Sequence, residues 1–237
     1  MKHETIYGIR PVVEALRSGR RKVFEVIDAV GVEEVANAAS GACGVSVKRA
    51  SRQRVEELAR GGVHQGVAAR VEAYPYSGLE EMLSTPEPLI LVLDGVTDPR
   101  NLGAVLRAAD GAGASGVVIP KDRAVGVTAA AVKASAGASE HVLVARVTNL
   151  RRAVDMMKEA GLWVYAAEAG GTPYNELDLA GAVALVLGSE GRGVRRLVRE
   201  GCDGTVSIPM LGAVESLNVS VASAVLLYEA RRRRGWP

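Results

Sequence analysis

Three separated segments hold the residues whose types and spacing could do chemistry on a polar ligand. In residues 94–103, polar side chains lead from an apolar run into a helix that carries Arg107. Residues 188–193 read Gly-Ser-Glu-Gly-Arg-Gly, and three glycines in six positions let a ligand approach the backbone and leave helix amides open to an anion. In residues 208–222, Ser216 and Asn218 stand where the chain becomes helical. Together these segments could hold and orient a ligand that bears phosphate or hydroxyl groups.

The order of the glycines excludes two common nucleotide sites. The pattern is GxxGxG, whereas a dinucleotide-binding turn needs GxGxxG and a P-loop needs GxxxxGK[ST]. The three histidines are scattered, and the two cysteines lie far apart with no CxxC neighbour. We therefore expect neither a metal site nor a disulfide; these residues are His3, His64, His141, Cys43 and Cys202.

The elements that must position the three segments alternate between strand and helix. After residue 88, the predicted strands have no internal polar residues, which is typical of a parallel sheet covered on both faces. Such sheets bind ligands beyond the carboxyl ends of their strands, so the loops after Leu93, Leu187 and Ile208 are expected to meet at one edge. Predicted strands are 89–93, 116–119, 142–144, 163–167, 183–187 and 205–208; predicted helices are 102–112, 127–135, 150–160, 194–199 and 217–231. Asn101 and Asn218 each have a plainer interpretation as helix caps.

The first third of the chain is predicted to be a separate, smaller α/β unit. Residues 74–88 are rich in Pro, Gly and Ser around a short helical patch at 79–83, which indicates a linker. We expect residues 1–73 to form the first domain and residues 89–237 the second. In the first, helices are predicted at 11–17, 32–39 and 52–60, and strands at 23–27, 45–48 and 66–71.

Composition narrows the class further. With 237 residues, 48% hydrophobic and 24% charged, the chain can bury a core, and 4% aromatic content disfavours a protein that stacks bases on exposed rings. Lys and Arg exceed Asp and Glu by three in residues 1–73 but not in the rest, so a polyanion would meet mainly the front domain. The start lacks a secretory signal and no apolar stretch reaches membrane length, which predicts a cytoplasmic protein.

Taken together, the three segments resemble the signature motifs of one family, the SpoU (TrmH) RNA ribose 2′-O-methyltransferases of the SPOUT superfamily. The matching stretches are Asn-Leu-Gly-Ala-Val-Leu-Arg at 101–107, residues 187–193, and residues 208–222. Ile-Tyr-Gly-Ile at 6–9 and His-Gln-Gly-Val at 64–67 resemble the small RNA-binding domain of the branch that methylates guanosine in rRNA and tRNA. The resemblance covers nearly the whole chain.

The resemblance implies an α/β fold of two parts. A small α/β RNA-binding domain similar to a ribosomal-protein fold would precede a parallel-sheet catalytic domain that ends in a deep trefoil knot. The knot would hold S-adenosylmethionine in a bent form, with backbone contacts from Gly188, Ile208 and Leu217. A homodimer would complete the site, and no metal would take part.

The family's active-site positions fall on Asn101, Arg107, Glu190, Ser216 and Asn218. Because a guanidinium stays protonated at neutral pH, we expect Arg107 to bind a phosphate and stabilise the developing 2′-alkoxide, while that phosphate or solvent takes the proton. Glu190 would orient Arg107 or its loop, and the amides and Ser216 would hold groups in place. The three turns are expected to form one pocket in which Arg107 faces the donor methyl group.

The function expected from the resemblance is 2′-O-methylation of a guanosine in 23S rRNA. A tRNA substrate, a resistance-type methylation of ribosomal adenosine, and an inactive RNA-binding or ribosome assembly factor remain alternatives. The connection between Ile27 and Val32 is shorter than in relatives, which predicts a smaller RNA contact. Candidate phosphate contacts are Arg192, Arg10, Arg17, Arg20, Arg21, Lys22 and the run 231–234, although positive charge in that run also suits a helix C-terminus.

Overall fold

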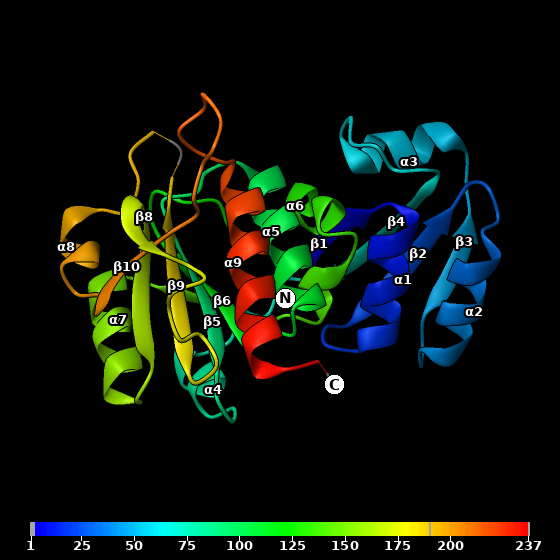
Figure 1. Ribbon diagram of the computed structural model, residues 1–237. Coiled ribbons are helices and arrows are strands. Elements are labelled where there is room, and N and C mark those ends of the chain that lie inside the picture. Colours follow the sequence, from blue (N-terminus) through cyan, green and yellow to red (C-terminus); the bar gives the residue numbers. More distant parts are fainter. Residues whose placement is uncertain (1–2, 190, 237) are drawn as a thin grey trace. The chain divides into compact units, whose positions relative to one another are not determined.

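The chain divides into two compact units, each with its own sheet (Figure 1). The computed structural model describes residues 3–189 and 191–236. The first unit combines the N-terminal residues up to 75 with residues 127–141, and the second comprises residues 76–126 together with the chain from 142 onward. The composition of residues 74–88 predicts a boundary there, but it does not predict that residues 127–141 belong to the first unit. Local composition carries no information about which distant segment they pack against.

The first unit has a mixed sheet of four strands in the order β1-β4-β2-β3. Only β2 and β3 are parallel, and β4 pairs antiparallel with both β1 and β2. The predicted helices and strands are present, but β1 was not predicted, because its polar edge sequence shows no apolar alternation. The elements are β1 (His3–Tyr7), α1 (Ile9–Ser18), β2 (Val23–Asp28), α2 (Glu33–Gly41), β3 (Ser46–Arg49), α3 (Arg52–Ala59), β4 (Val67–Glu72), α6 (Ala129–Ala134) and the 3₁₀ turn η1 (Ala138–Glu140).

The short connection after β2 is held by one buried carboxylate. Asp28 accepts backbone hydrogen bonds from Val30, Gly31 and Val32 at 2.9, 2.7 and 2.7 Å. Three donors on one side chain close the turn in the fewest residues, and α2 begins directly afterwards. The connection is therefore short because the Asp28 side chain holds it in a tight turn.

A buried ion pair joins residues 127–141 to the N-terminal part of the same unit. Arg21 Nε donates to Glu140 Oε2 at 3.0 Å, Nη2 contacts the other carboxylate oxygen, and the two side chains are 1% and 0% exposed. The Tyr74 hydroxyl adds a hydrogen bond to the Ser139 carbonyl at 2.8 Å. Since Arg21 is buried and fully engaged in this contact, the expectation that it meets RNA phosphate is wrong.

The second unit is built on the predicted parallel sheet. All its strand pairs are parallel, in the order β10-β8-β9-β5-β6-β7. The elements are α4 (Leu79–Leu83), β5 (Leu89–Asp94), α5 (Pro99–Gly111), β6 (Gly116–Pro120), β7 (Val144–Val147), α7 (Leu150–Glu159), β8 (Trp163–Pro173), β9 (Val183–Gly188), α8 (Arg196–Arg199), β10 (Gly204–Ser207) and α9 (Val219–Arg234).

Helices cover both faces of this sheet (Figure 1). On one face, apolar side chains of α4, α7 and α8 pack on Ile90, Val92 and Val186 of the central strands. On the other, α5 and α9 pack against each other and on the central strands. The strands are buried throughout because both faces are covered, which explains their continuous apolar sequence. The patch 79–83 is also part of this core, since Leu79 and Met82 are buried in it.

Of the two asparagines interpreted as helix caps, one caps its helix and the other does not. Asp98 caps α5 by accepting a hydrogen bond from the Arg100 amide at 2.8 Å, with Pro99 in the first helical position. Asn101 therefore lies inside the first turn and does not cap this helix. Asn218 does cap α9, as its plainer interpretation held, by accepting from the Ser220 amide at 2.9 Å.

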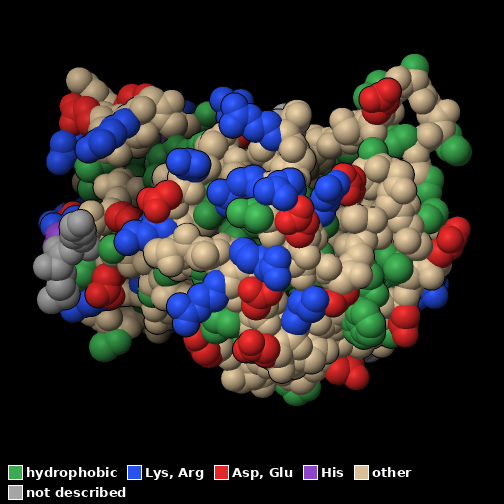
Figure 2. All heavy atoms as spheres, turned by 90° about the vertical axis from the view of Figure 1, so that its left-hand side faces the viewer, with side chains coloured by type: hydrophobic (Ala, Val, Ile, Leu, Met, Phe, Trp, Pro, Cys, Tyr) green, Lys and Arg blue, Asp and Glu red, His purple; other side chains and the backbone are tan. Residues whose placement is uncertain are grey.

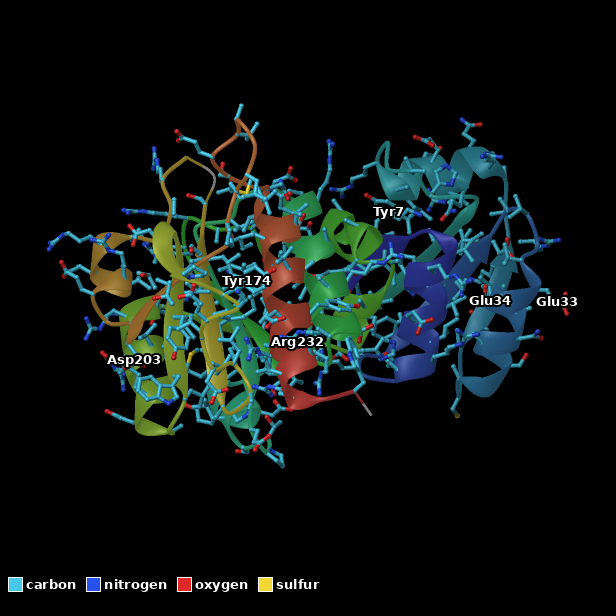
Figure 3. The ribbon with its side chains drawn as sticks, in the orientation of Figure 1. Tyr7, Glu33, Glu34, Tyr174, Asp203 and Arg232 are labelled. Atoms are coloured by element: carbon cyan, nitrogen blue, oxygen red, sulfur yellow. The ribbon has the colours of Figure 1, made fainter. Side chains whose placement is uncertain are left out.

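The arginines at the end of α9 are occupied within the second unit. Arg232, labelled in Figure 3, and Arg233 both bind Glu229 on the preceding turn, at 2.7 and 2.8 Å. Arg231 donates to the carbonyls of Ala112 and Gly113. These contacts, together with those of Arg234 to the carbonyls of residues 88 and 181, favour a structural role for the run over RNA contact.

Breaking the buried pair of the first unit is expected to be costly. Glu140→Gln removes the buried carboxylate and leaves the Arg21 guanidinium with the longer contact to Glu4, at 3.4 Å, whose side chain is 44% exposed. We expect the free energy of unfolding to fall by about 3–5 kcal/mol. Denaturant unfolding of the full chain measures this. Glu57→Gln is the matched control, because Glu57 pairs with Arg54 at the surface, where such pairs contribute about 0–1 kcal/mol. Equal losses in both variants would contradict the assignment.

The Glu229 contacts predict a pH-dependent contribution to stability. Hydrogen bonding to Arg232 lowers the pKa of Glu229 from 4.5 to about 2. A carboxylate with a lowered folded-state pKa stabilises the fold above pH 4.5 and loses this effect as the pH falls toward 2. Glu229→Gln should therefore unfold at lower temperature than the wild type at pH 7, and the difference should shrink below pH 4.5. A difference that stays constant from pH 7 to pH 3 would disprove it.

Candidate functional site

The first and third chemically interesting segments meet through a pair of amides. Asn218 Nδ2 donates a hydrogen bond to Asn101 Oδ1 at 3.1 Å. The orientation of the Asn218 amide follows from its capping role, because its Oδ1 already accepts from the Ser220 amide and hydroxyl, at 2.9 and 2.6 Å. The cap of α9 thus presents an NH₂ group to the first turn of α5, although the two residues are 117 positions apart.

The glycine loop after β9 depends on close backbone contact. A Cβ atom at Gly188 would lie 1.9 Å from the Gly193 carbonyl carbon and 2.3 Å from the Val194 nitrogen, which no side chain tolerates. Gly191 and Gly193 have φ values of 77° and 63°, a region that glycine enters without steric cost. The Gly193 amide donates to the Ser189 carbonyl at 2.9 Å and closes the loop. The close contact therefore requires glycine at position 188, and the positive φ values favour glycine at positions 191 and 193.

Two neighbouring cavities border the turn that precedes α9, and the smaller one also borders this loop. The larger, of about 430 Å³, is lined by Ile208 and residues 215–217 on one side and by β8 on the other. The smaller, of about 300 Å³, is lined by residues of the glycine loop, including Gly188. Both share the same four residues, which makes them parts of one cleft; these are Ala167, Ser216, Leu217 and Ala222. We call the two together the double cavity.

An irregularity in β8 opens the larger cavity. The pairing with β10 shifts from Thr205↔Ala166 to Val206↔Thr172, so the residues between them leave the ladder. Gly170, with a φ of 77°, allows this excursion, and residues 167–170 form a wall of the cavity. The sequence-based strand ends at residue 167, and the pair Gly170-Gly171 is the signal that points to the excursion.

The predicted site residues do not all converge. Gly188, Ile208, Ser216 and Leu217 line the double cavity, and Asn101 is linked to it through Asn218. Arg107 lies outside its lining: it is exposed on α5, six residues after Asn101 and therefore about 120° around the helix, and it bonds to no residue that the structure describes. Glu190 lies outside the described residues.

Sequence reasoning did not single out an anchor at the end of the glycine loop. Asp94, the last residue of β5, is 0% exposed and accepts from the Arg195 amide at 2.8 Å and from its Nε at 2.6 Å. This pair ties the loop to the carboxyl end of the neighbouring strand. The sequence does contain a signal for this anchor, because a single carboxylate residue directly follows the apolar run 89–93.

The basic residues proposed from sequence fall into two groups. In the first unit, Glu34 on α2 (Figure 3) accepts from Arg10 and Arg17 at 2.8 and 3.4 Å, so part of this charge is compensated. Arg192 in the glycine loop is exposed, and its side chain forms no ion pair with the described residues. The described part of the chain has no cluster of three or more potential metal-binding side chains, and none of its helices meets the length and hydropathy of a membrane span.

Comparison with known families decides the assignment. The SpoU rRNA Methylase family matches residues 88–228, and the family described as RNA 2'-O ribose methyltransferase substrate binding matches residues 5–77. The chain belongs to the SpoU methylase family. The 23S rRNA (guanosine-2'-O-)-methyltransferase RlmB of Escherichia coli is 44% identical over 98% of this chain and 99% of its own. RlmB of Photorhabdus laumondii is 45% identical over 98% of both chains.

Solved structures share the fold over nearly the whole chain. The SpoU methyltransferase AviRb from Streptomyces viridochromogenes in complex with AdoMet superposes with a TM-score of 0.85, at 26% identity, over 98% of this chain and 90% of its own. An AdoMet-bound rRNA methyltransferase from Sinorhizobium meliloti gives a TM-score of 0.82 at 28% identity, over 97% and 87%.

Replacing Gly188 is expected to disorganise the glycine loop. Gly188→Ala places a methyl group where the Gly193 and Val194 backbone lies, so the loop must move, and trypsin should cleave faster after Arg192. Gly181→Ala is the matched control, because a Cβ there meets nothing within 4 Å and that glycine has no positive φ. Limited proteolysis with mass spectrometry measures both rates, and identical rates would contradict the close contact.

Proposed function

We propose that this protein transfers a methyl group from S-adenosylmethionine to the ribose 2′-hydroxyl of a guanosine in 23S rRNA, in the cytoplasm. The observation that carries the proposal is the double cavity, which joins the glycine loop to the turn at 215–217 in a SpoU-family chain. The RlmB relatives at 44% and 45% identity support the substrate.

The double cavity fits the proposed cofactor. Its volumes of about 430 and 300 Å³ lie in the range of small-molecule sites, and much of its wall is apolar side chain or glycine backbone. Gly188, Ile208 and Leu217 would hold the cofactor by backbone contacts, and the carboxylates of Glu168 and Glu215 can accept hydrogen bonds from its polar groups. When bound, S-adenosylmethionine supplies a methyl group on a positively charged sulfur.

The chain's own residues position the nucleophile and stabilise its charge. The Asn218 amide, held by the cap of α9, and Asn101 can orient the ribose hydroxyls beside the cavity. In this proposal Arg107 binds a substrate phosphate and stabilises the developing alkoxide, while that phosphate or solvent takes the proton. Ser216 fixes the turn at the cavity wall, and Glu190 orients Arg107 or the loop.

We further propose a homodimer, which brings Arg107 to the cavity that it does not line within one chain. The turn before α9 and the first part of this helix expose apolar side chains that a second copy of the chain would cover. Leu211, Val214 and Val221 are 100%, 67% and 47% exposed. Large apolar side chains exposed in one segment of the chain are consistent with a protein interface.

The proposed catalytic domain, residues 89–237, would contain the deep trefoil knot of the superfamily. The supporting observation is the path of its end: the chain leaves β10 at one edge of the sheet, passes the glycine loop along the double cavity, and returns in α9 to pack on α5. The proposed RNA-binding domain, residues 1–73, is connected to it by residues 74–88 and resembles a ribosomal-protein fold.

Mapping the product tests the proposal. The protein is incubated with radiolabelled S-adenosylmethionine and total RNA from a strain that lacks it, and the labelled nucleotide is identified by mass spectrometry. We expect 2′-O-methylguanosine in 23S rRNA. A methylated base would disprove the reaction, label in tRNA or on adenosine would correct the substrate, and cofactor binding without transfer would indicate an RNA-binding or assembly factor.

The planar guanidinium of Arg107 is expected to matter beyond its charge. Arg107→Lys keeps the charge but loses the bidentate fork, so kcat should fall by about tenfold or more, while the affinity for S-adenosylmethionine measured by calorimetry stays the same. Arg100→Lys, also on the exposed surface of α5, is the control and should keep the wild-type rate. A wild-type kcat in Arg107→Lys would refute the bidentate role.

A further inference from the structure

A third cavity lies beside the double cavity and is lined by arginines. It measures about 350 Å³ and shares Ser189 and Gly193 with the smaller part of the double cavity. It opens at the carboxyl ends of β5, β6 and β9, where ligands of parallel sheets bind. Its charged lining consists of three arginines and two carboxylates; these are Arg123, Arg192, Arg195, Asp94 and Asp122. We call it the Arg123 cavity.

The cationic groups of this cavity are available for an anion. Both oxygens of Asp94 are engaged by Arg195, through its amide and its Nε, so the Nη groups of Arg195 stay open. Those Nη groups and the side chains of Arg123 and Arg192 form no hydrogen bond or ion pair within residues 3–189 and 191–236. Among the described residues of the lining, Asp122, which is exposed, is the one carboxylate left to oppose them. These described side chains therefore carry a net positive charge after the internal pair is counted.

The backbone at Arg123 has a conformation that is uncommon for a residue with a side chain. Its φ of 58° is in the left-handed region, which disfavours a side chain and favours glycine. Arg60 has a similar φ of 49°, but it follows the last turn of α3, where left-handed residues are common. Arg123 stands in no helix cap, in the loop after β6. Residues held in disfavoured conformations concentrate at binding sites, and here the residue lines a cavity.

Further arginines lie beyond this cavity. Arg195 also lines a groove of about 640 Å³ between α7 and α8, together with Arg151 and Arg196, which pair with Asp155 and Glu200 at 3.1 and 2.9 Å. Figure 2, which faces the side of the second unit with α7 and α8, shows many Lys and Arg side chains on this face, with Asp and Glu side chains among them. A guanidinium pairs with phosphate through parallel hydrogen bonds, and a row of them suits a nucleic-acid backbone.

We propose that the Arg123 cavity binds the backbone phosphate of the nucleotide that flanks the methylated ribose. This inference rests on the proposed function, because the adjacent double cavity then holds the methyl donor. Arg123 and Arg192 contact the phosphate, and Asp94 acts as a positioning residue that holds Arg195 through Nε and directs its Nη groups to the cavity. The phosphate bound here differs from the one assigned to Arg107, and it sets substrate affinity and register rather than the rate of transfer.

The test uses Arg123→Gly and Arg192→Gln in the full-length protein, with methyl transfer to the RNA fragment that carries the mapped site. Glycine suits the backbone at position 123, so this variant should unfold at or above the wild-type temperature. For each variant we expect the KM for RNA to rise by about tenfold, with kcat within about twofold and unchanged affinity for S-adenosylmethionine. Arg152→Gln removes an exposed charge of α7 outside the Arg123 cavity and should keep the wild-type KM.

The salt dependence of RNA binding distinguishes the loss of a phosphate contact from a general distortion of the RNA-binding surface. Binding of the same fragment, labelled with fluorescein, is measured between 50 and about 300 mM KCl, a range in which phosphate contacts dominate the salt effect. The slope of log K against log salt should become shallower by about 0.7 for each arginine removed, and stay unchanged in Arg152→Gln. Wild-type KM and slope in both variants, with an active wild type, would overturn this inference alone. If the wild-type protein methylated no ribose, the result would instead contradict the proposed function.

Discussion

The site depends on one steric constraint, the contact between the backbone at Gly188 and the backbone at residues 193 and 194. Because β9 ends at this contact, the glycine loop turns back within six residues and stays close to the sheet edge. The same loop lines both the smaller part of the double cavity and the Arg123 cavity. Asp94 then fixes the far end of the loop from the neighbouring strand.

Much of the second unit could be predicted because its strands and helices are regular. Continuous apolar runs such as 89–93 and 183–187 indicate buried parallel strands, and their carboxyl ends indicate where the loops must meet. The capping role of Asn218 could also be foreseen from residue type. Its bond to Asn101 could not, since nothing in either local sequence specifies a partner 117 residues away.

What escaped prediction depends on tertiary context. β1 is a polar edge strand that only its pairing with β4 reveals. Arg21 resembles a surface arginine in sequence, next to Arg20 and Lys22, but its partner Glu140 comes from a distant segment. The position of Arg107 relative to the cavity follows from where α5 begins, and the start at Asp98 rather than Asn101 depends on a hydrogen bond to the Arg100 amide.

The grouping of residues 127–141 with the N-terminal unit has a consequence for how the chain is made. Arg21 is synthesised long before Glu140, the residue that it pairs with in the interior, so this unit cannot finish folding when its first 75 residues leave the ribosome exit tunnel. It must wait until β5, α5 and β6 have also emerged. A gene fragment cut at the linker would therefore encode a domain that lacks Glu140, the buried partner of Arg21.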